Sequence, residues 1–123
     1  MKIWILEGFV TPEMIQEDIE KTRALAESVT KEEDLKLCQD MIESHEKRLE
    51  DHPGGYWMGY DGKTDYRTFC EFAKRTLRHY RDDNGRKWRV LKAEIPDDAK
   101  YWIGAYTNGV ENEGVLRYLK ATM

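Results

Sequence analysis

Gly62, Lys63 and Thr64 are the residues whose order most directly suggests chemistry, because Gly-Lys-Thr ends the phosphate-binding loop of many nucleotide hydrolases. That loop needs a further glycine five positions before Gly62, so that successive backbone N–H groups surround the phosphates. The position holds Trp57, and the segment before it is predicted to be a helix where the loop requires a strand. The sequence therefore does not predict a nucleoside-triphosphate site. One weaker alternative stays open: Lys63 and the first N–H groups of the next helix attract an anion, although an ordinary N-cap at Thr64 explains the same residues.

Cysteine and histidine form no pattern typical of catalysis or metal binding. Cys38 and His45 lie seven residues apart and Cys70 and His79 nine apart, whereas zinc ligands usually come in closely spaced pairs. The sequence also lacks a Ser-His-Asp set and a cofactor fingerprint. We therefore predict no metal, no cofactor and no enzymatic activity. One enzymatic alternative, in which His79 activates Cys70 as a nucleophile, ranks third, behind the two binding functions described below. Reduced, buried thiols are the default expectation for both cysteines.

The length of 123 residues suits a single domain, and the aromatic content of 11% supplies apolar surface for a core. The net charge of -4 is unevenly distributed: residues 1–52 carry 14 acidic and 7 basic side chains, whereas residues 53–123 carry 10 and 13. The apolar start, MKIWILEGF, is too short for a signal peptide or a membrane span. We expect a cytoplasmic protein that does not enter a membrane.

The first half of the chain is predicted to be a strand followed by an acidic helical hairpin. Residues 2–6 (KIWIL) favour a strand. Thr11-Pro12-Glu13 is typical of a helix start, and apolar residues recur at helical spacing as far as Val29. Residues 30–33 (TKEE) resemble a capping box that opens a second helix, which ends at residues 52–55 (HPGG). The short connection predicts that the two helices fold back antiparallel.

The second half is predicted to hold a glycine- and aromatic-rich loop over residues 53–63, a basic helix over residues 64–82 and a β-meander over residues 86–121. The three strands of the meander are expected at residues 87–95, 101–106 and 115–120. The predicted fold is therefore α+β, with three helices packed on a three- to four-stranded, mostly antiparallel sheet in the order β-α-α-α-β-β-β. The first strand joins that sheet either at an edge or in the middle.

The acidic hairpin and the aromatic loop are the first candidates for a partner-binding surface. Rows of carboxylates on a rigid scaffold can imitate a phosphate backbone and occupy a basic groove of another protein. Exposed helix faces are also often acidic for solubility alone. The candidate partner-binding residues are Tyr56, Trp57, Tyr60, Glu32, Glu33, Asp40 and Glu43.

A basic stripe on the third predicted helix and the following strand is the second candidate. Basic side chains at spacings of three and four share one helix face, with Tyr80 and Trp88 beside them for stacking. A solvated helix face, an anion site and a contact with the acidic hairpin of a second copy, in a homodimer, are all compatible with this pattern. The candidate anion-binding residues are Lys74, Arg75, Arg78, Arg81, Arg86, Lys87 and Arg89.

Residues 93–104 (AEIPDDAKYWIG), followed by residues 116–119 (LRYL), resemble the C-terminal segment of small uncharacterised phage and prophage proteins. In this segment a strand runs into Ile-Pro, a turn, Ala-Lys-Tyr-aromatic, a glycine and a final strand. Asp98 stands where those proteins usually have glycine, and Glu113-Gly114 replaces their usual Ser-Asp. The resemblance implies a mobile-element origin, and thus a bacterial host cell, without any particular chemistry.

Together these features favour a non-enzymatic phage or mobile-element protein that acts by binding. Its most concrete form is a counter-defence inhibitor, similar to an anti-CRISPR protein, that blocks a host nuclease through the acidic hairpin and the aromatic loop. The alternative is a nucleic-acid or nucleotide-binding protein that uses the basic stripe.

Overall fold

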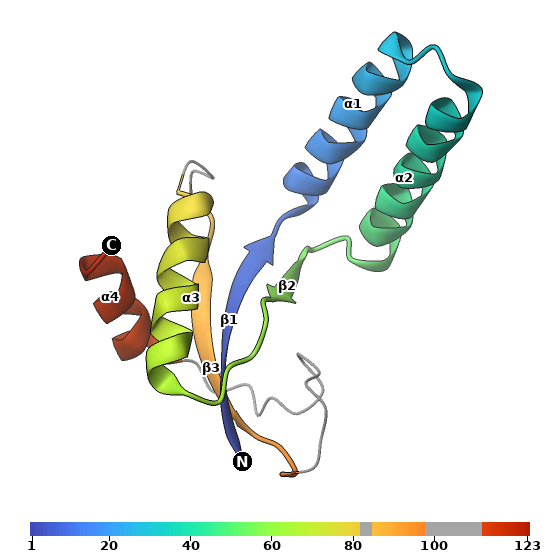
Figure 1. The fold of residues 1–123 in the computed structure, drawn as a ribbon. Coiled ribbons are helices and arrows are strands. Elements are labelled where there is room, and N and C mark those ends of the chain that lie inside the picture. Colours follow the sequence, from blue (N-terminus) through green and yellow to red (C-terminus); the bar gives the residue numbers. More distant parts are fainter. Residues whose placement is uncertain (82–84, 98–111) are drawn as a thin grey trace. The chain divides into compact units, whose positions relative to one another are not determined.

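The computed structural model of the protein describes residues 1–81, 85–97 and 112–123, and its α+β class confirms the predicted one. The chain divides into two compact units, a helical hairpin (Val10–Tyr56) and an α/β unit made of Met1–Phe9 and Trp57–Met123. Figure 1 labels the elements along the chain. Their bounds are β1 (Lys2–Val10), α1 (Pro12–Ser28), α2 (Glu32–Asp51), β2 (Tyr56–Gly59), α3 (Tyr66–His79), β3 (Trp88–Glu94) and α4 (Glu113–Ala121).

The sheet of the α/β unit has the strand order β2-β1-β3, so β1 lies in the middle. β1 pairs antiparallel with β3, in a register that sets Leu6 opposite Val90 and Gly8 opposite Trp88. Beyond the end of β2, Trp4 and Lys63 exchange two backbone hydrogen bonds of 2.8 and 2.9 Å in an antiparallel bridge. In the sequence, the hairpin α1–α2 is thus inserted between β1 and β2, two strands that are neighbours in the sheet. The sequence left the place of the first strand open, and the pairing settles it.

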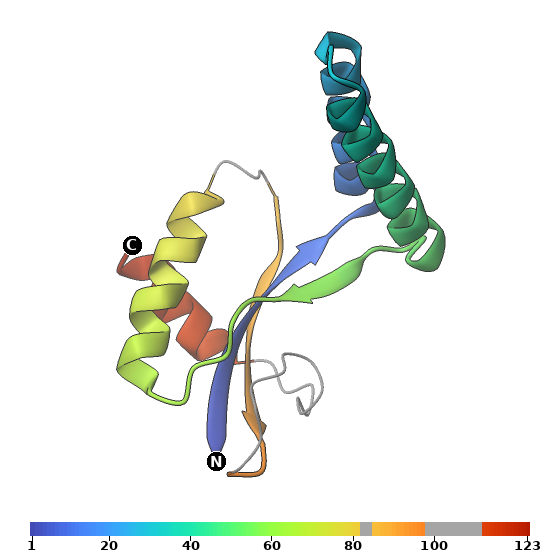
Figure 2. The same ribbon diagram turned by 45° about the vertical axis from the view of Figure 1, so that its right-hand side comes forward.

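Two apolar clusters lie on opposite faces of the sheet, because alternate side chains of β1 and β3 point to opposite faces. On one face Leu6 and Val90 pack with buried residues of α3 and α4, among them Phe69 and Leu119. Figures 1 and 2 show both helices on this side of the sheet. On the other face Ile5 is fully buried in a cluster that includes Ile3, Leu91, Ala93 and Ile95.

The helical hairpin forms where its local sequence predicts. Thr11 is the N-cap of α1, with its Oγ1 accepting a hydrogen bond of 3.2 Å from the N–H of Met14, and Pro12 occupies the first helical position. The predicted capping box at the start of α2 is wrong, because the N-cap is Lys31 and it makes no side-chain capping bond. Thr30 stands one residue too early to cap. The antiparallel course of the two helices is as predicted (Figure 1).

The last element is a helix, which corrects the strand predicted for residues 115–120. Leu116 and Leu119 are buried three residues apart, on one side of α4, whereas Arg117 between them is exposed. A strand would turn Arg117 to the same face as Leu119, at the cost of burying its charge. The side chain of Asn112 caps the helix by accepting a hydrogen bond of 3.3 Å from the N–H of Val115.

Other element predictions are partly changed. The segment predicted as a loop over residues 53–63 contains the short edge strand β2, so the predicted order β-α-α-α-β-β-β is wrong. Of the predicted meander only β3 is a described strand, and the strand expected at residues 101–106 lies outside the described residues. The third helix is shorter than predicted and ends at His79. Among the helices of residues 1–81, 85–97 and 112–123, none is both long and apolar enough to cross a membrane.

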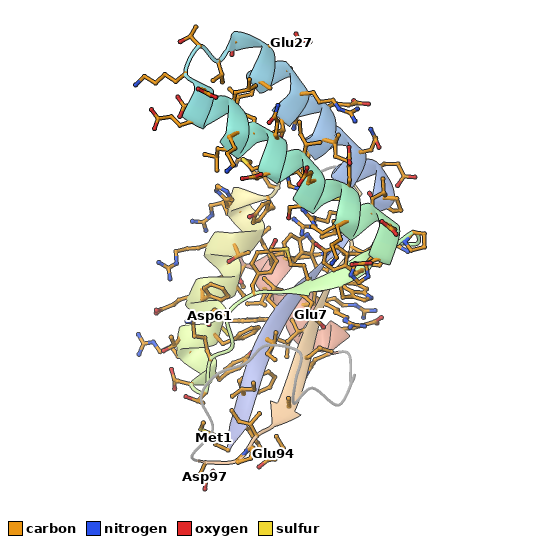
Figure 3. The ribbon with its side chains drawn as sticks, turned by 90° about the vertical axis from the view of Figure 1, so that its right-hand side faces the viewer. Met1, Glu7, Glu27, Asp61, Glu94 and Asp97 are labelled. Carbon is orange, nitrogen blue, oxygen red and sulfur yellow. The ribbon has the colours of Figure 1, made fainter. Side chains whose placement is uncertain are left out.

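The free end of β1 is tied to the far end of β3 by charge. The Met1 ammonium lies 2.7 Å from Oδ1 of Asp97 and 3.8 Å from Oε1 of Glu94. Figure 3 labels the three residues. The hydrogen bond between the Met1 ammonium and the Asp97 carboxylate raises the pKa of the ammonium and lowers the pKa of Asp97. The backbone N–H of Ile95 also donates to the carbonyl of Met1 at 2.8 Å, which extends the β1–β3 pairing.

Candidate interaction surfaces

The charge of the chain is separated by structural unit. Val10–Tyr56 carries 13 acidic and 6 basic side chains, a net charge of -7, whereas the α/β unit carries 11 acidic and 14 basic, a net charge of +3. The uneven charge seen along the sequence therefore coincides with the division into compact units. All four candidate carboxylates of the hairpin are exposed on α2: Glu32, Glu33, Asp40 and Glu43.

The hairpin buries only a narrow strip between its two helices, so most of its surface faces outward. Its cluster consists of the buried Val10, Ile15 and Ile19, with Ile42 and Leu49 of α2 partly buried against them. The single buried residue of α2 is Cys38. Large apolar side chains consequently stay exposed among the carboxylates, namely Leu25, Leu35, Leu37 and Met41. A shallow hollow at the start of α2 is lined by Glu32, Glu33, Leu35, Lys36 and Gln39.

The three candidate aromatic residues of the predicted loop lie in three different settings. Tyr56 belongs to the hairpin, where its hydroxyl accepts a hydrogen bond of 3.0 Å from Nε of Arg48 and its ring contacts His52. Trp57 packs edge-on against Phe9 at 5.2 Å between ring centroids. Tyr60 joins a separate cluster in the α/β unit. All three rings are partly buried, so they contribute to packing and leave only part of their surface for a partner.

Tyr60, Tyr80 and Trp88 surround the guanidinium of Arg86. The Cζ atom of Arg86 lies 4.6 Å from the ring centroid of Trp88 and 5.0 Å from that of Tyr80, and its Nη2 donates a hydrogen bond of 3.0 Å to the Tyr60 hydroxyl. Such contacts combine cation–π attraction with apolar packing. Burial raises the pKa of Tyr60 above its ordinary value, although the nearby Arg86 opposes the shift. Arg86, a candidate anion-binding residue, is thus engaged within the unit.

Arg89, another candidate, is held on the opposite face of the sheet. Its Nε lies 3.0 Å from Oε1 of Glu7, and its Cζ lies 4.2 Å from the ring centroid of Trp57. The Glu7 side chain on β1, labelled in Figure 3, is only 8% exposed. A carboxylate this buried needs a charged partner, and the register of β1 with β3 places Arg89 directly opposite.

The remaining candidates mark a basic helix surface. Arg75 and Arg78 are exposed on α3, and the ammonium of Lys74 lies 5.2 Å from the ring centroid of Tyr118 on α4. Arg81, after the end of α3, and Lys87, before β3, are also exposed. The structure therefore does not place the seven candidates in one row: three belong to α3, and Arg86 and Arg89 pack on opposite faces of the sheet.

The start of α3 is an ordinary capped helix end. Asp65, rather than Thr64, is the N-cap, and its Oδ2 accepts hydrogen bonds of 2.9 Å from both the N–H and the hydroxyl of Thr68. These bonds lower the pKa of Asp65. The Lys63 ammonium lies 2.8 Å from Oδ2 of Asp61, which Figure 3 labels. The Gly-Lys-Thr sequence suggested a weak anion site made of Lys63 and the first N–H groups of α3. The carboxylates of Asp61 and Asp65 already contact Lys63 and an N–H group of α3.

The cysteines and histidines are not brought together as nucleophile and base. Cys70 is buried in the core of the α/β unit, whereas His79 is exposed at the end of α3, with its ring against Tyr80. Cys38 is buried in the hairpin, and Nδ1 of His45 lies 2.9 Å from Nη1 of Arg48.

Sequence reasoning did not single out Glu7 or Gly8 as features of interest. The available signal for Glu7 was one carboxylate in the otherwise apolar run KIWILEGFV.

No protein family, curated protein or solved structure matches the chain.

Proposed function

We propose that the protein acts by binding, and that the acidic hairpin occupies a basic, nucleic-acid-binding surface of another protein. The observation that carries the proposal is the concentration of a net charge of -7 in one compact unit of the chain. Carboxylates held at fixed spacing along a helix compete with phosphates for the same arginine and lysine side chains.

The chemistry of α2 fits this role better than a purely solubilising surface does. Glu33, Asp40 and Glu43 are exposed along the helix, and Leu37 is 58% exposed among them. A surface that serves only solubility has no need for large exposed apolar side chains, whereas burying them in an interface is favourable. The carboxylates then supply attraction at long range and the apolar side chains supply contact area.

The particular partner we propose is a bacterial nuclease, which would make the protein a counter-defence inhibitor of the anti-CRISPR type. This finer proposal rests on the resemblance of residues 93–119 to phage proteins. Most of that segment, residues 98–111, lies outside the described residues.

The test is an affinity purification from bacterial lysate followed by a competition assay. We expect a captured nucleic-acid-binding protein that is displaced by added DNA or RNA and whose nucleic-acid binding or cleavage the protein inhibits. The variant Glu33→Lys, Asp40→Lys, Glu43→Lys should lose capture. Its matched control changes three exposed carboxylates of α1 by the same total charge (Glu13→Lys, Glu20→Lys, Glu27→Lys) and should keep most of it. A partner that binds both variants equally, or that ignores nucleic acid, contradicts the proposal.

A second candidate function uses the basic surface of α3. Arg75 and Arg78 are exposed on α3, and the ring of Tyr118 on α4 is 49% exposed near the ammonium of Lys74. This combination suits phosphate contacts with ring stacking on a single-stranded nucleic acid. Binding of a labelled single strand should then weaken steeply with salt and disappear in the Arg75→Glu, Arg78→Glu variant. Binding that ignores both would remove this candidate.

A further inference from the structure

The outer side of α2 carries a row of residues suited to a protein contact. Glu33, Leu37 and Met41 are spaced four apart, so they follow one another along the helix, and Asp34 and Asp40 adjoin them. Leu37 is 58% exposed and Met41 is 41% exposed. We call Glu33, Leu37 and Met41 the hairpin row. It combines apolar contact area with negative charge.

The α/β unit carries a surface of the opposite charge and similar composition. On α3 and α4, six basic side chains stand against two acidic ones, Glu71 and Glu113. Tyr118 is 49% exposed beneath the ammonium of Lys74. We call Lys74, Arg75, Arg78 and Tyr118 the basic face. It too combines apolar area with charge, here positive.

We infer that the hairpin row of one copy docks on the basic face of a second copy of the chain. Contact between two hairpins would bring together two units of net charge -7, and repulsion of that size opposes association. The basic face supplies the complementary charge, and its Tyr118 supplies a ring for Leu37 and Met41 to cover. The contact is therefore head-to-tail: each copy offers both surfaces and uses different residues on each side.

This inference does not depend on the proposed function, because self-association needs no other protein. It does make the two processes compete, since both use the outer side of α2. A partner with a basic surface would therefore release copies of the chain from one another as it binds.

The first experiment measures the mass of the protein by sedimentation equilibrium over a range of concentrations. We expect reversible self-association that weakens at least tenfold between about 0.05 M and about 0.5 M salt, because salt screens the charge contacts. A monomer at every concentration up to about 100 µM in low salt would overturn the inference, since it leaves only affinities too weak for a specific interface.

Two variants then distinguish the head-to-tail contact from other dimers. The hairpin variant (Glu33→Lys, Leu37→Ser, Met41→Ser) keeps its basic face, and the face variant (Arg75→Glu, Arg78→Glu, Tyr118→Ser) keeps its hairpin row. All substituted residues are exposed, so folding should be preserved, and circular dichroism checks it. Each variant alone should be monomeric, whereas an equimolar mixture should form a complex of one copy of each. A face variant that still self-associates, or a mixture that stays monomeric, contradicts head-to-tail docking.

Discussion

Gly8 and Trp88 face each other across β1 and β3 at a separation that leaves no room for a side chain on Gly8. A Cβ atom there would lie 2.9 Å from Cζ3 of Trp88 and 2.9 Å from Nε and Nη2 of Arg86. The flexible end of Arg86 can shift, but the Trp88 ring is confined by Tyr60 and Tyr80, whose centroids lie 5.7 and 6.0 Å from its own. The missing side chain at Gly8 is therefore what admits the aromatic cluster around Arg86.

Replacing Gly8 by alanine should destabilise the protein by about 1–3 kcal/mol, because the added methyl group forces the packed Trp88 ring to move. Gly54→Ala is the matched control, since a Cβ atom at Gly54 meets no atom within 4 Å. Its φ is not positive either, so alanine is not strained there. Urea unfolding of both variants measures the difference. Equal stabilities of the two variants would show that the Gly8 contact does not limit packing.

The buried ion pair between Glu7 and Arg89 should be far more sensitive than an exposed pair of the same chemistry. Glu7→Gln leaves the Arg89 guanidinium, whose side chain is 21% exposed, without its charged acceptor at 3.0 Å. We expect a loss of about 3 kcal/mol, as for the removal of one partner from a buried pair. Glu71→Gln breaks the exposed pair with Arg67 and should cost no more than about 0.5 kcal/mol.

Denaturant unfolding again provides the measurement for this pair. A cost for Glu7→Gln as small as that for Glu71→Gln would mean that solvent, rather than Arg89, stabilises the Glu7 carboxylate.

Because α4 is a helix, substitutions at Leu119 and at Arg117 should change the stability of the protein by very different amounts. Leu119 is fully buried against α3 and β3, so Leu119→Ala should cost about 3 kcal/mol. Arg117→Ala removes only an exposed pair with Glu113 and should stay within about 0.5 kcal/mol. In a strand the two side chains would share a face, and both substitutions would act on the same environment. Similar losses from the two variants, measured by thermal unfolding, would contradict the helix.

Local chemistry predicted the elements whose signals lie within a few residues. Thr11-Pro12 marks a helix start because the capping group is adjacent in sequence to the N–H groups that it satisfies. The start of α3 was predicted to within one residue, since its cap is Asp65 where the sequence indicated Thr64. The same short-range reasoning gave the antiparallel hairpin and its end at His52. It failed at α4, where the apolar run 115–119 fits a strand by composition and a helix by spacing, and contact with the sheet decides between them.

The candidate surfaces could be predicted as charge patterns but not as contacts. Glu7 and Arg89 are 82 residues apart, and only the register of β1 with β3 brings them together. The alternation of side chains along extended backbone also separates Arg86 from Arg89, which the sequence placed in one stripe, because residues three apart in or beside a strand point to opposite faces. Strand pairing over such distances carries no local signal, so the sequence could not show which cations are engaged within the unit.

The cap of α3 should make stability depend on pH in a way that one substitution isolates. The folded pKa of Asp65 is lowered by its hydrogen bonds from Thr68, so the carboxylate stabilises the fold above the unfolded pKa and this stabilisation is lost as the pH falls through the folded pKa. Asparagine caps helices as well as aspartate does but does not titrate. Asp65→Asn should therefore be somewhat less stable than the wild type near pH 7, and the difference should shrink as the pH falls below about 4, the ordinary pKa of an aspartate.

Asp65→Ala separates this charge effect from capping itself. Because alanine cannot accept the bonds of 2.9 Å from Thr68, this variant should be less stable than Asp65→Asn throughout the same pH range. Urea midpoints of the three proteins between pH 3 and pH 7 supply the test, with the circular dichroism signal of the folded state as a check on structure. A constant difference between wild type and Asp65→Asn across that range would show that the Asp65 charge contributes nothing, and that the cap acts through hydrogen-bond geometry alone.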